Sequence, residues 1–316
     1  MIYGFNALGV FLGGLLSLKG NRVTFINNAG DEKKAVSGIR IIMPHRWLKV
    51  ENLKFAAHGK ADYLFICPEN DRQNESIQHI QEELAELVCP ETEITVLNSI
   101  NPQWKEQWNA PVTFGLALLE LSMLQEDQVE LFPGTAVIIL EKNIRQKKFL
   151  APLKQYGVKF RFTESMEPYY HAFQIYNLIY LPVALANSTT GNFLSYPEGQ
   201  KILEHIITEG LKIFEQAGKK IAVLPALDPR KLLNSIQKKP WQFSIQRFLP
   251  DRNFNPVLQK LLLKEQAVRI VNTSLLELSS EIGIELFWNS KIVDLLDSVK
   301  ETGFYKNPVE LIKAVE

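Results

Sequence analysis

The residues best spaced to do chemistry lie near the start of the chain, in the stretch GFNALG. Gly4, Asn6 and Gly9 occupy the three glycine positions of the pattern GxGxxG, which marks a dinucleotide-binding turn when it joins a strand to a helix. The first glycine makes the bend, the second lets the backbone approach a pyrophosphate, and the third lets helix and strand pack closely. Gly4 and Gly9 keep the first and third positions, and asparagine replaces the second.

Asn6 leaves two interpretations of this turn open. Asparagine tolerates a positive φ better than other residues with a side chain, so Asn6 could preserve the backbone shape. Its side chain, however, would stand where a phosphate normally approaches. The amides of Ala7 and Leu8 would still offer the positive end of a helix dipole to an anion. The stretch is therefore either a cofactor-binding turn formed by Gly4, Asn6, Ala7, Leu8 and Gly9, or a plain strand-to-helix connection that binds nothing.

Composition favours a small-molecule partner. The 316 residues are enough for two domains with separate cores. The chain has 35 Lys and Arg residues against 35 Asp and Glu residues, which leaves no net charge to attract nucleic acid or an anionic membrane. Cys67 and Cys89 form no CxxC pair, so we expect reduced thiols, no metal site and a cytoplasmic location. The apolar run from Ala7 to Leu18 is too short to span a bilayer.

The elements that must position the turn alternate between strand and helix up to about residue 165. Apolar and β-branched runs predict strands, and apolar residues at helical spacing predict helices. The expected strands are 1–3, 22–27, 38–43, 61–67, 93–98, 110–115, 136–141 and 158–163, and the expected helices are 7–19, 74–88 and 144–156. This alternation indicates a mostly parallel sheet covered on both faces.

The second half of the chain reads as all helix. Residues 167–186 can form one long apolar helix, which Pro182 should kink. The sequence SYPE predicts the next helix start, with Ser195 as its N-cap, and that helix ends at Gly218. Further helices are expected at 229–236, 255–263, 269–282 and 289–299. The fold class is therefore an α/β Rossmann-like domain over 1–165 and an all-α domain over 166–316.

Several segments, taken in order, resemble the ketopantoate reductases. GFNALGVFLGGLLSLKGNRVTFI is similar to the opening of that family, TVLNS to its strand ending in Gln-Asn-Gly, and APVTFGLALLE to the segment that follows. FTESMEPYYHAFQIYNLIYLPVALAN is similar to its interdomain helix, and LSSEIGIELFWNSKIVDLL to its closing helices. The resemblance implies a Rossmann domain, a helical domain like the C-terminal domain of 6-phosphogluconate dehydrogenase, and NADPH-dependent reduction of a 2-keto acid in pantothenate biosynthesis.

The resemblance implies catalytic positions, of which this chain keeps only some. Asn98 matches an asparagine that follows the strand over the nicotinamide, and its alternative role is to cap the turn at the strand end. Asn177 matches the first asparagine of the family's Asn-x-x-x-Asn-Pro, which places Phe173 at the position of the catalytic lysine. Phenylalanine cannot donate a proton. His171 is a candidate substitute acid, although a histidine on a half-buried helix is more often structural.

The positions that would hold the cofactor and the substrate are also altered. Asn27 and Asn28 follow the second strand, where an acidic residue would select NAD and an arginine NADP. Lys33 and Lys34 lie a few residues on, and Glu69 stands where the family tends to have a lysine. The family's glutamate aligns near Ala267, two residues from Glu265, and its substrate-binding serine near Asn255. The implied cofactor is NADP, with NAD or no cofactor left open.

Three hypotheses follow. The first is a reductase that takes a small 2-keto acid such as 2-dehydropantoate, with Asn98, Asn177 and His171 at the carbonyl. The second is a non-catalytic member of the same fold that binds a nucleotide or a partner. The third is a dehydrogenase whose acid comes from Asp228, Arg230 or Lys231. The apolar stripes of the helical half also leave a homodimer open.

Overall fold

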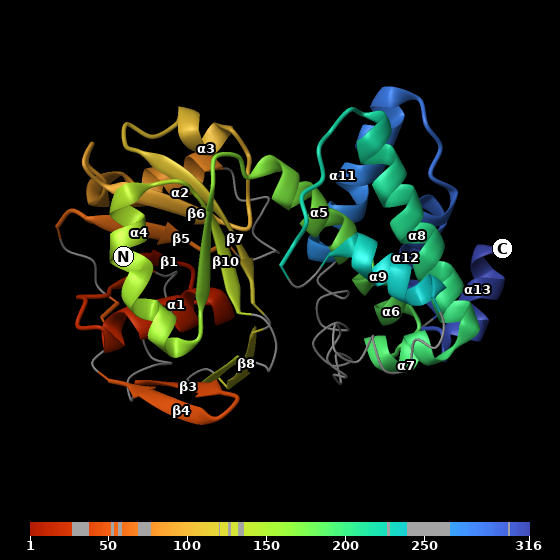
Figure 1. Cartoon of the computed structure of the whole chain (residues 1–316), viewed down its shortest axis with the longest axis horizontal. Coiled ribbons are helices and arrows are strands. Elements are labelled where there is room, and N and C mark those ends of the chain that lie inside the picture. The colour runs from red at the N-terminus through yellow and green to blue at the C-terminus, as the bar shows by residue number, and fades with distance from the viewer. Residues whose placement is uncertain are drawn as a thin grey trace. The chain divides into compact units, whose positions relative to one another are not determined.

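The computed structural model describes residues 1–26, 38–51, 54–55, 59–68, 77–119, 121–125, 128–131, 136–225, 228–238, 266–302 and 304–316. Asn27, Asn28, Lys33, Lys34, Glu69, Asn255, Glu265 and the expected helix 255–263 therefore lie outside the described residues. The chain divides into two compact units, Met1–Met166 and Glu167–Glu316 (Figure 1). Each unit is built around its own buried apolar cluster.

A seven-stranded sheet forms the centre of the first unit, in the order β11-β10-β7-β6-β5-β1-β2. Its strands are β1 (Ile2–Tyr3), β2 (Phe25–Ile26), β5 (Tyr63–Ile66), β6 (Glu93–Leu97), β7 (Val112–Leu118), β10 (Val137–Glu141) and β11 (Lys159–Thr163). All neighbours pair in parallel except β7 and β10, which are antiparallel. The predicted α/β unit with a mostly parallel sheet is confirmed.

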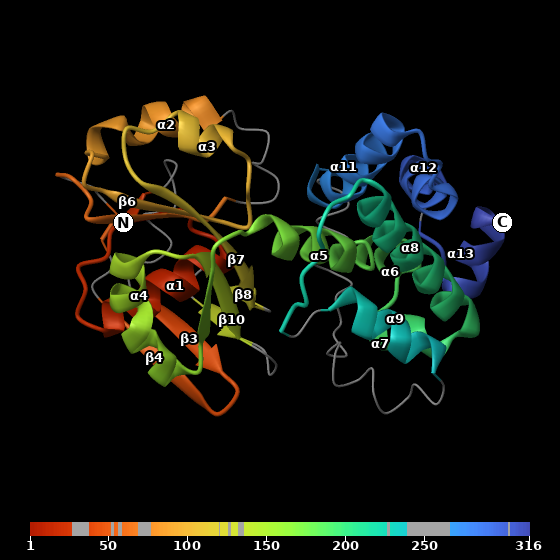
Figure 2. The same ribbon diagram turned by 45° about the horizontal axis from the view of Figure 1, so that its top comes forward.

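Helices cover both faces of this sheet. They are α1 (Ala7–Leu18), α2 (Ile77–Leu84), α3 (Gln103–Glu106) and α4 (Ile144–Leu150), with 3-10 turns at Ala85–Leu87 and Ala151–Tyr156. Figure 2 shows α2 and α3 on one face and α1 and α4 on the other. The predicted helix 144–156 thus begins as α-helix and ends as 3-10 turn, at Gly157 with φ +83°.

The carboxyl end of β1 lies where the strand order reverses. From β1 the chain runs through α1 to β2 on one side, and it later returns to β5 on the other side. Ile2 pairs with Phe25 of β2 and with Phe65 of β5. Ligands of open parallel sheets bind at such a reversal, outside the carboxyl ends of the strands.

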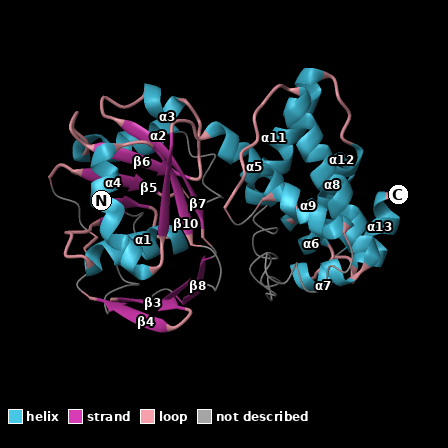
Figure 3. Cartoon of the chain, in the orientation of Figure 1, coloured by secondary structure: helices cyan, strands magenta, loops and turns pink. Residues whose placement is uncertain are grey.

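A second sheet, absent from the sequence-based expectation, packs beneath α1. It has four strands in the order β4-β3-β9-β8: β3 (Ile39–Met43), β4 (Arg46–Val50), β8 (Leu121–Gln125) and β9 (Gln128–Leu131). Figure 3 shows β3, β4 and β8 of this sheet below α1. Ile39, Ile41 and Met43 are buried, and a Cβ added to Gly14 of α1 would lie 2.7 Å from Ile41 Cδ1. The strand predicted at 38–43 exists but belongs to this sheet. Its two neighbours decide that, β4 next along the chain and β9 far away in sequence, because alternation along one strand does not specify its neighbours.

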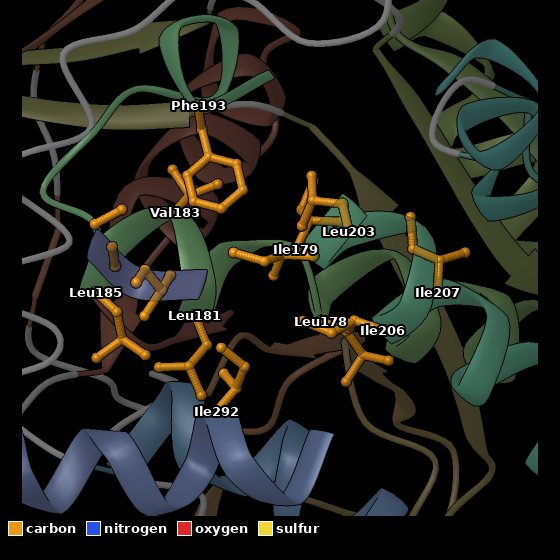
Figure 4. Close-up of a cluster of buried hydrophobic side chains, with 14 of the residues drawn as sticks. Leu178, Ile179, Leu181, Val183, Leu185, Phe193, Leu203, Ile206, Ile207 and Ile292 are labelled. Carbon is orange, nitrogen blue, oxygen red and sulfur yellow. The ribbon is translucent and has the colours of Figure 1, made fainter. Parts of the chain in front are cut away.

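The described part of the second unit contains helices and no strand, as predicted. Its helices are α5 (Glu167–Asn177), α6 (Tyr180–Leu185), α7 (Thr190–Ser195), α8 (Pro197–Gln216), α9 (Pro229–Gln237), α11 (Gln266–Ile282), α12 (Phe287–Thr302) and α13 (Pro308–Val315). Residues from several of these helices meet in one apolar cluster. In Figure 4, Leu181 of α6 points toward Ile292 of α12, and Leu178 lies beside Ile206 of α8.

Two predicted helix boundaries in this unit are wrong. The expected helix 167–186 is two helices, α5 and α6, with a break at Leu178 and Ile179. Pro182 lacks the amide that would bond the Leu178 carbonyl, and its ring crowds that carbonyl, so the helix breaks there instead of bending. Ser195 does not cap α8: it ends α7, and its Oγ donates to the Asn192 carbonyl at 2.6 Å. The N-cap of α8 is Tyr196, and the predicted end at Gly218, with φ +67°, is confirmed.

Candidate functional site

The turn between β1 and α1 requires glycine at two positions. Gly4 has φ +100°, and a Cβ there would lie 2.2 Å from the Cys67 carbonyl oxygen at the end of β5. A Cβ on Gly9 would lie 2.0 Å from the Gly4 carbonyl oxygen. The bend and the close packing of helix on strand therefore both depend on the missing side chains, as in a dinucleotide-binding turn.

Asn6 differs from the expectation that it preserves a positive φ. Its backbone is extended, with φ −106° and ψ 178°, and it is the N-cap of α1. Its Oδ1 accepts hydrogen bonds from the amides of Leu8 at 3.1 Å and Gly9 at 3.0 Å. Its Nδ2 donates to the Cys67 carbonyl at 2.7 Å. The first amides of α1 have no backbone acceptors within the helix, and two of them are thus hydrogen-bonded by a side chain.

These contacts decide how well the turn fits a dinucleotide. The side chain of Asn6 joins the β1–α1 turn to the end of β5, and so spans the point where the strand order reverses. The backbone shape fits a pyrophosphate, because Gly4 and Gly9 form the tight turn. The amides of Leu8 and Gly9, which would donate to a pyrophosphate, already donate to the Asn6 carboxamide. They fit a pyrophosphate only once that carboxamide turns away.

Asn98 follows β6 in a left-handed conformation, with φ +61°. Its amide donates to the Gly115 carbonyl at 2.7 Å, and its Oδ1 accepts from the Ala117 amide at 2.9 Å. Both partners lie in β7, so Asn98 fastens the carboxyl end of β6 to its neighbour. Asparagine is among the few residues that adopt this conformation readily. The left-handed backbone alone therefore explains why an asparagine occupies position 98.

His171 is buried in the helical unit, where its ring has partners on several sides. Its side chain is 5% exposed, its Nδ1 lies 2.9 Å from the Lys220 carbonyl oxygen, and its Nε2 lies 3.6 Å from Glu167 Oε1. The ring stacks on Phe214 with the centroids 4.6 Å apart. Burial lowers the pKa of His171, while the Lys220 carbonyl and Glu167 oppose this shift and Lys219 adds to it. This is the environment of a neutral structural histidine.

The two other positions of interest on α5 are half-buried. Phe173, at the lysine position, offers no ionisable group, and Asn177 is the last residue of the helix. The turn considered for an alternative acid has a structural explanation. Asp228 is buried and caps α9, with its Oδ1 accepting from the amides of Arg230 at 3.0 Å and Lys231 at 3.1 Å.

Sequence reasoning missed the Cys67 carbonyl, which contacts both the glycine and the asparagine of the turn. A main-chain oxygen has no sequence signal, and the pairing of β5 with β1 brings it there. Within the described ranges, no cluster of three or more His, Cys, Asp or Glu side chains could hold a metal ion. None of the helices described is long and apolar enough to cross a membrane.

No family model matches the chain, and no curated protein matches its sequence. Solved structures do match over nearly the whole length. A PanE/ApbA family ketopantoate reductase from Ralstonia eutropha JMP134 is 14% identical, with a TM-score of 0.76 over 96% of this chain and 99% of that chain. A 2-dehydropantoate 2-reductase from Geobacter metallireducens GS-15 is 18% identical, with a TM-score of 0.72 over 94% and 99%.

A D-mandelate dehydrogenase, solved with NADH and anilino(oxo)acetate, is 15% identical, with a TM-score of 0.75 over 96% of this chain and 99% of that chain. At such identities the likeness establishes the fold. The chain has the fold of the ketopantoate reductases, a parallel-sheet α/β unit followed by a helical unit, and the resemblance seen in its sequence is confirmed at that level.

Proposed function

We propose that the protein is a nicotinamide-dependent reductase of 2-keto acids, of the ketopantoate reductase type. The observation that carries this proposal is the full-length likeness, which covers 96% of this chain and 99% of the Ralstonia eutropha reductase. The tight turn of Gly4 and Gly9 at the strand reversal supports it, because that turn is where such folds hold a pyrophosphate. Residues 1–165 would then bind the dinucleotide, and residues 166–316 the substrate.

The roles that we propose follow from the chemistry of each residue. When bound, a reduced nicotinamide supplies the hydride that the carbonyl carbon accepts. Asn98 and Asn177 would donate side-chain amide hydrogen bonds that orient the substrate carbonyl. His171 suits the acid's role poorly, because its ring is buried against the Lys220 carbonyl and Glu167. With Phe173 at the lysine position, we propose that the alkoxide takes its proton from water.

A second candidate is a non-catalytic protein of this fold that binds a nucleotide or a partner. Two observations favour it: Phe173 carries no proton donor, and the carboxamide of Asn6 bonds the amides of Leu8 and Gly9. Fold alone does not imply activity, since one scaffold can be reused for binding. On this candidate, Phe173→Lys would yield little or no turnover.

The experiment that tests the proposal is calorimetric titration of the purified protein with NADPH and with NADH. The expected result is saturable binding with a preference for one of them, with NADPH the cofactor that we propose. A panel of 2-keto acids that includes 2-dehydropantoate then follows, with nucleotide oxidation measured by absorbance. Binding without oxidation of either nucleotide favours the second candidate. A large gain of turnover in Phe173→Lys contradicts that candidate, because it shows an otherwise intact site.

We also propose that the protein forms a homodimer through its helical unit and works in the cytoplasm, in pantothenate biosynthesis. The ketopantoate reductase of Staphylococcus aureus, 13% identical with a TM-score of 0.70 over 96% of this chain and 98% of that chain, is described as dimeric. Light scattering on a sizing column measures the mass directly. A monomer at every concentration tested would contradict the dimer.

A further inference from the structure

We infer that the side chain of Asn6 acts as a built-in competitor of the dinucleotide, so that its carboxamide must leave the turn before a pyrophosphate can bind. The inference rests on the proposed nucleotide site. It concerns how that site is regulated, and it does not depend on turnover.

The first step is the identity of the donors. The amides of the first turn of a helix lack partners within the helix, and with the helix dipole they attract anions. In α1, the amides of Leu8 and Gly9 both donate to Asn6 Oδ1, at 3.1 Å and 3.0 Å. An acceptor from the protein therefore already lies where a phosphate oxygen would lie.

The second step is how firmly this acceptor is held. Asn6 Nδ2 donates to the Cys67 carbonyl at 2.7 Å, so the carboxamide is fixed at both ends. The bond joins residues 61 apart in sequence, across the strand reversal where dinucleotides bind in open parallel sheets. Glycine, the usual residue at this position, can make none of these contacts.

The third step is the outcome of the competition. A phosphate oxygen carries charge and is a stronger acceptor than a neutral carboxamide, so nucleotide can displace Asn6. Displacement breaks three hydrogen bonds, which weakens binding by about tenfold to a thousandfold if each contributes the usual net amount. Asn6 thereby turns an open cofactor site into one that binds only at high nucleotide concentration.

The test is the affinity of wild type and Asn6→Gly for NADPH and NADH, measured by calorimetry. We expect the variant to bind at least about tenfold more tightly, because its amides are free. Asn6→Ala, which also lacks an acceptor, provides the same comparison if the glycine variant does not fold. Equal or weaker binding by a folded variant overturns the inference, and so does the absence of binding by both proteins.

Asn143 offers a matched control. It caps α4 in the same way, with Oδ1 accepting from Arg145 at 2.9 Å and Gln146 at 3.2 Å, and with Nδ2 donating to Glu93 Oε2 at 2.6 Å. Asn143→Gly should lower stability without changing nucleotide affinity. A tighter affinity in this control as well would overturn the inference, because general loosening would then explain the effect.

The same experiment separates this inference from the proposed function. Tighter binding by Asn6→Gly, with no oxidation of nucleotide by any 2-keto acid in either protein, supports the inference and contradicts the reductase. If the wild type turns over a 2-keto acid and its nucleotide affinity does not depend on residue 6, the reductase is supported and the inference is contradicted.

Discussion

At the scale of single residues, Gly4 is a position of the β1–α1 turn where both the backbone and a close contact exclude a side chain. Its φ of +100° disfavours any side chain, and a Cβ would also lie 2.2 Å from the Cys67 carbonyl oxygen. Gly4→Ala should therefore lower the free energy of unfolding by about 3 kcal/mol or more. Gly20 is the matched control, because its φ is +79° and no atom lies within 4 Å of its Cβ position.

Gly20→Ala should lower the free energy of unfolding by about 1 kcal/mol, from the backbone alone. Urea titration of both variants measures the difference. Equal losses in the two variants would mean that the contact with the end of β5 does not limit the turn.

At the same scale, the burial of His171 predicts how the stability of the protein depends on pH. Burial lowers its pKa from the ordinary value of 6.5. Just below pH 6.5, the His171 ring therefore binds a proton in the unfolded chain more readily than in the folded chain. Its contribution to the free energy of unfolding is complete above pH 6.5 and is lost as the pH falls below that value. Between about pH 7 and pH 5, wild-type stability should fall more steeply than that of His171→Gln, measured by urea titration.

The exposed histidine His45 provides the control for this slope. His45→Gln makes the same substitution at an exposed position, and so separates the loss of the buried ring from the effect of the substitution itself. A wild-type slope in His171→Gln would contradict the neutral, buried histidine described above.

At the scale of elements, a carboxylate joins two helices of the second unit. Glu209 of α8 accepts hydrogen bonds from the amides of Trp288 at 2.9 Å and Asn289 at 3.0 Å, at the start of α12. A carboxylate at a helix start satisfies free amides and the dipole together. Glu209→Ala should lower the free energy of unfolding by about 2 kcal/mol, measured by chemical denaturation.

Glu215, exposed on the same helix, is the control for that substitution. Glu215→Ala removes a carboxylate from α8 without touching the start of α12, and it should change stability by less than about 0.5 kcal/mol. A similar loss in both variants would contradict a specific role of Glu209.

At the scale of the whole molecule, the two buried clusters share no residue, which predicts separate responses to damage. Leu15 of α1 and Leu203 of α8 are fully buried leucines, one in each cluster. Either change to alanine should lower stability by about 3 kcal/mol. Hydrogen exchange should then increase within residues 1–166 for Leu15→Ala and within 167–316 for Leu203→Ala. Increased exchange throughout the chain in both variants would contradict independent cores.

The sequence by itself determined the order of elements and much of the architecture. Alternating strands and helices predicted the parallel sheet of the first unit, and apolar and amphipathic runs predicted most of the described helices of the second, but not α7 or α13. A local signal also held at Gly218, the predicted helix end, which follows α8 with φ +67°. These features depend on residues a few positions apart, where propensity and periodicity are informative.

Only the tertiary structure decided which strands share a sheet and what the candidate site residues contact. The strand at 39–43 joined a second sheet, where it pairs with β4, the next strand along the chain, and with β9, which is far away in sequence. The role of Asn6 depends on the Cys67 carbonyl, 61 residues away, and the environment of His171 on the Lys220 carbonyl, 49 residues away. A motif defines the spacing of side chains along the chain, but a main-chain partner from a distant strand or loop becomes available only once the chain has folded.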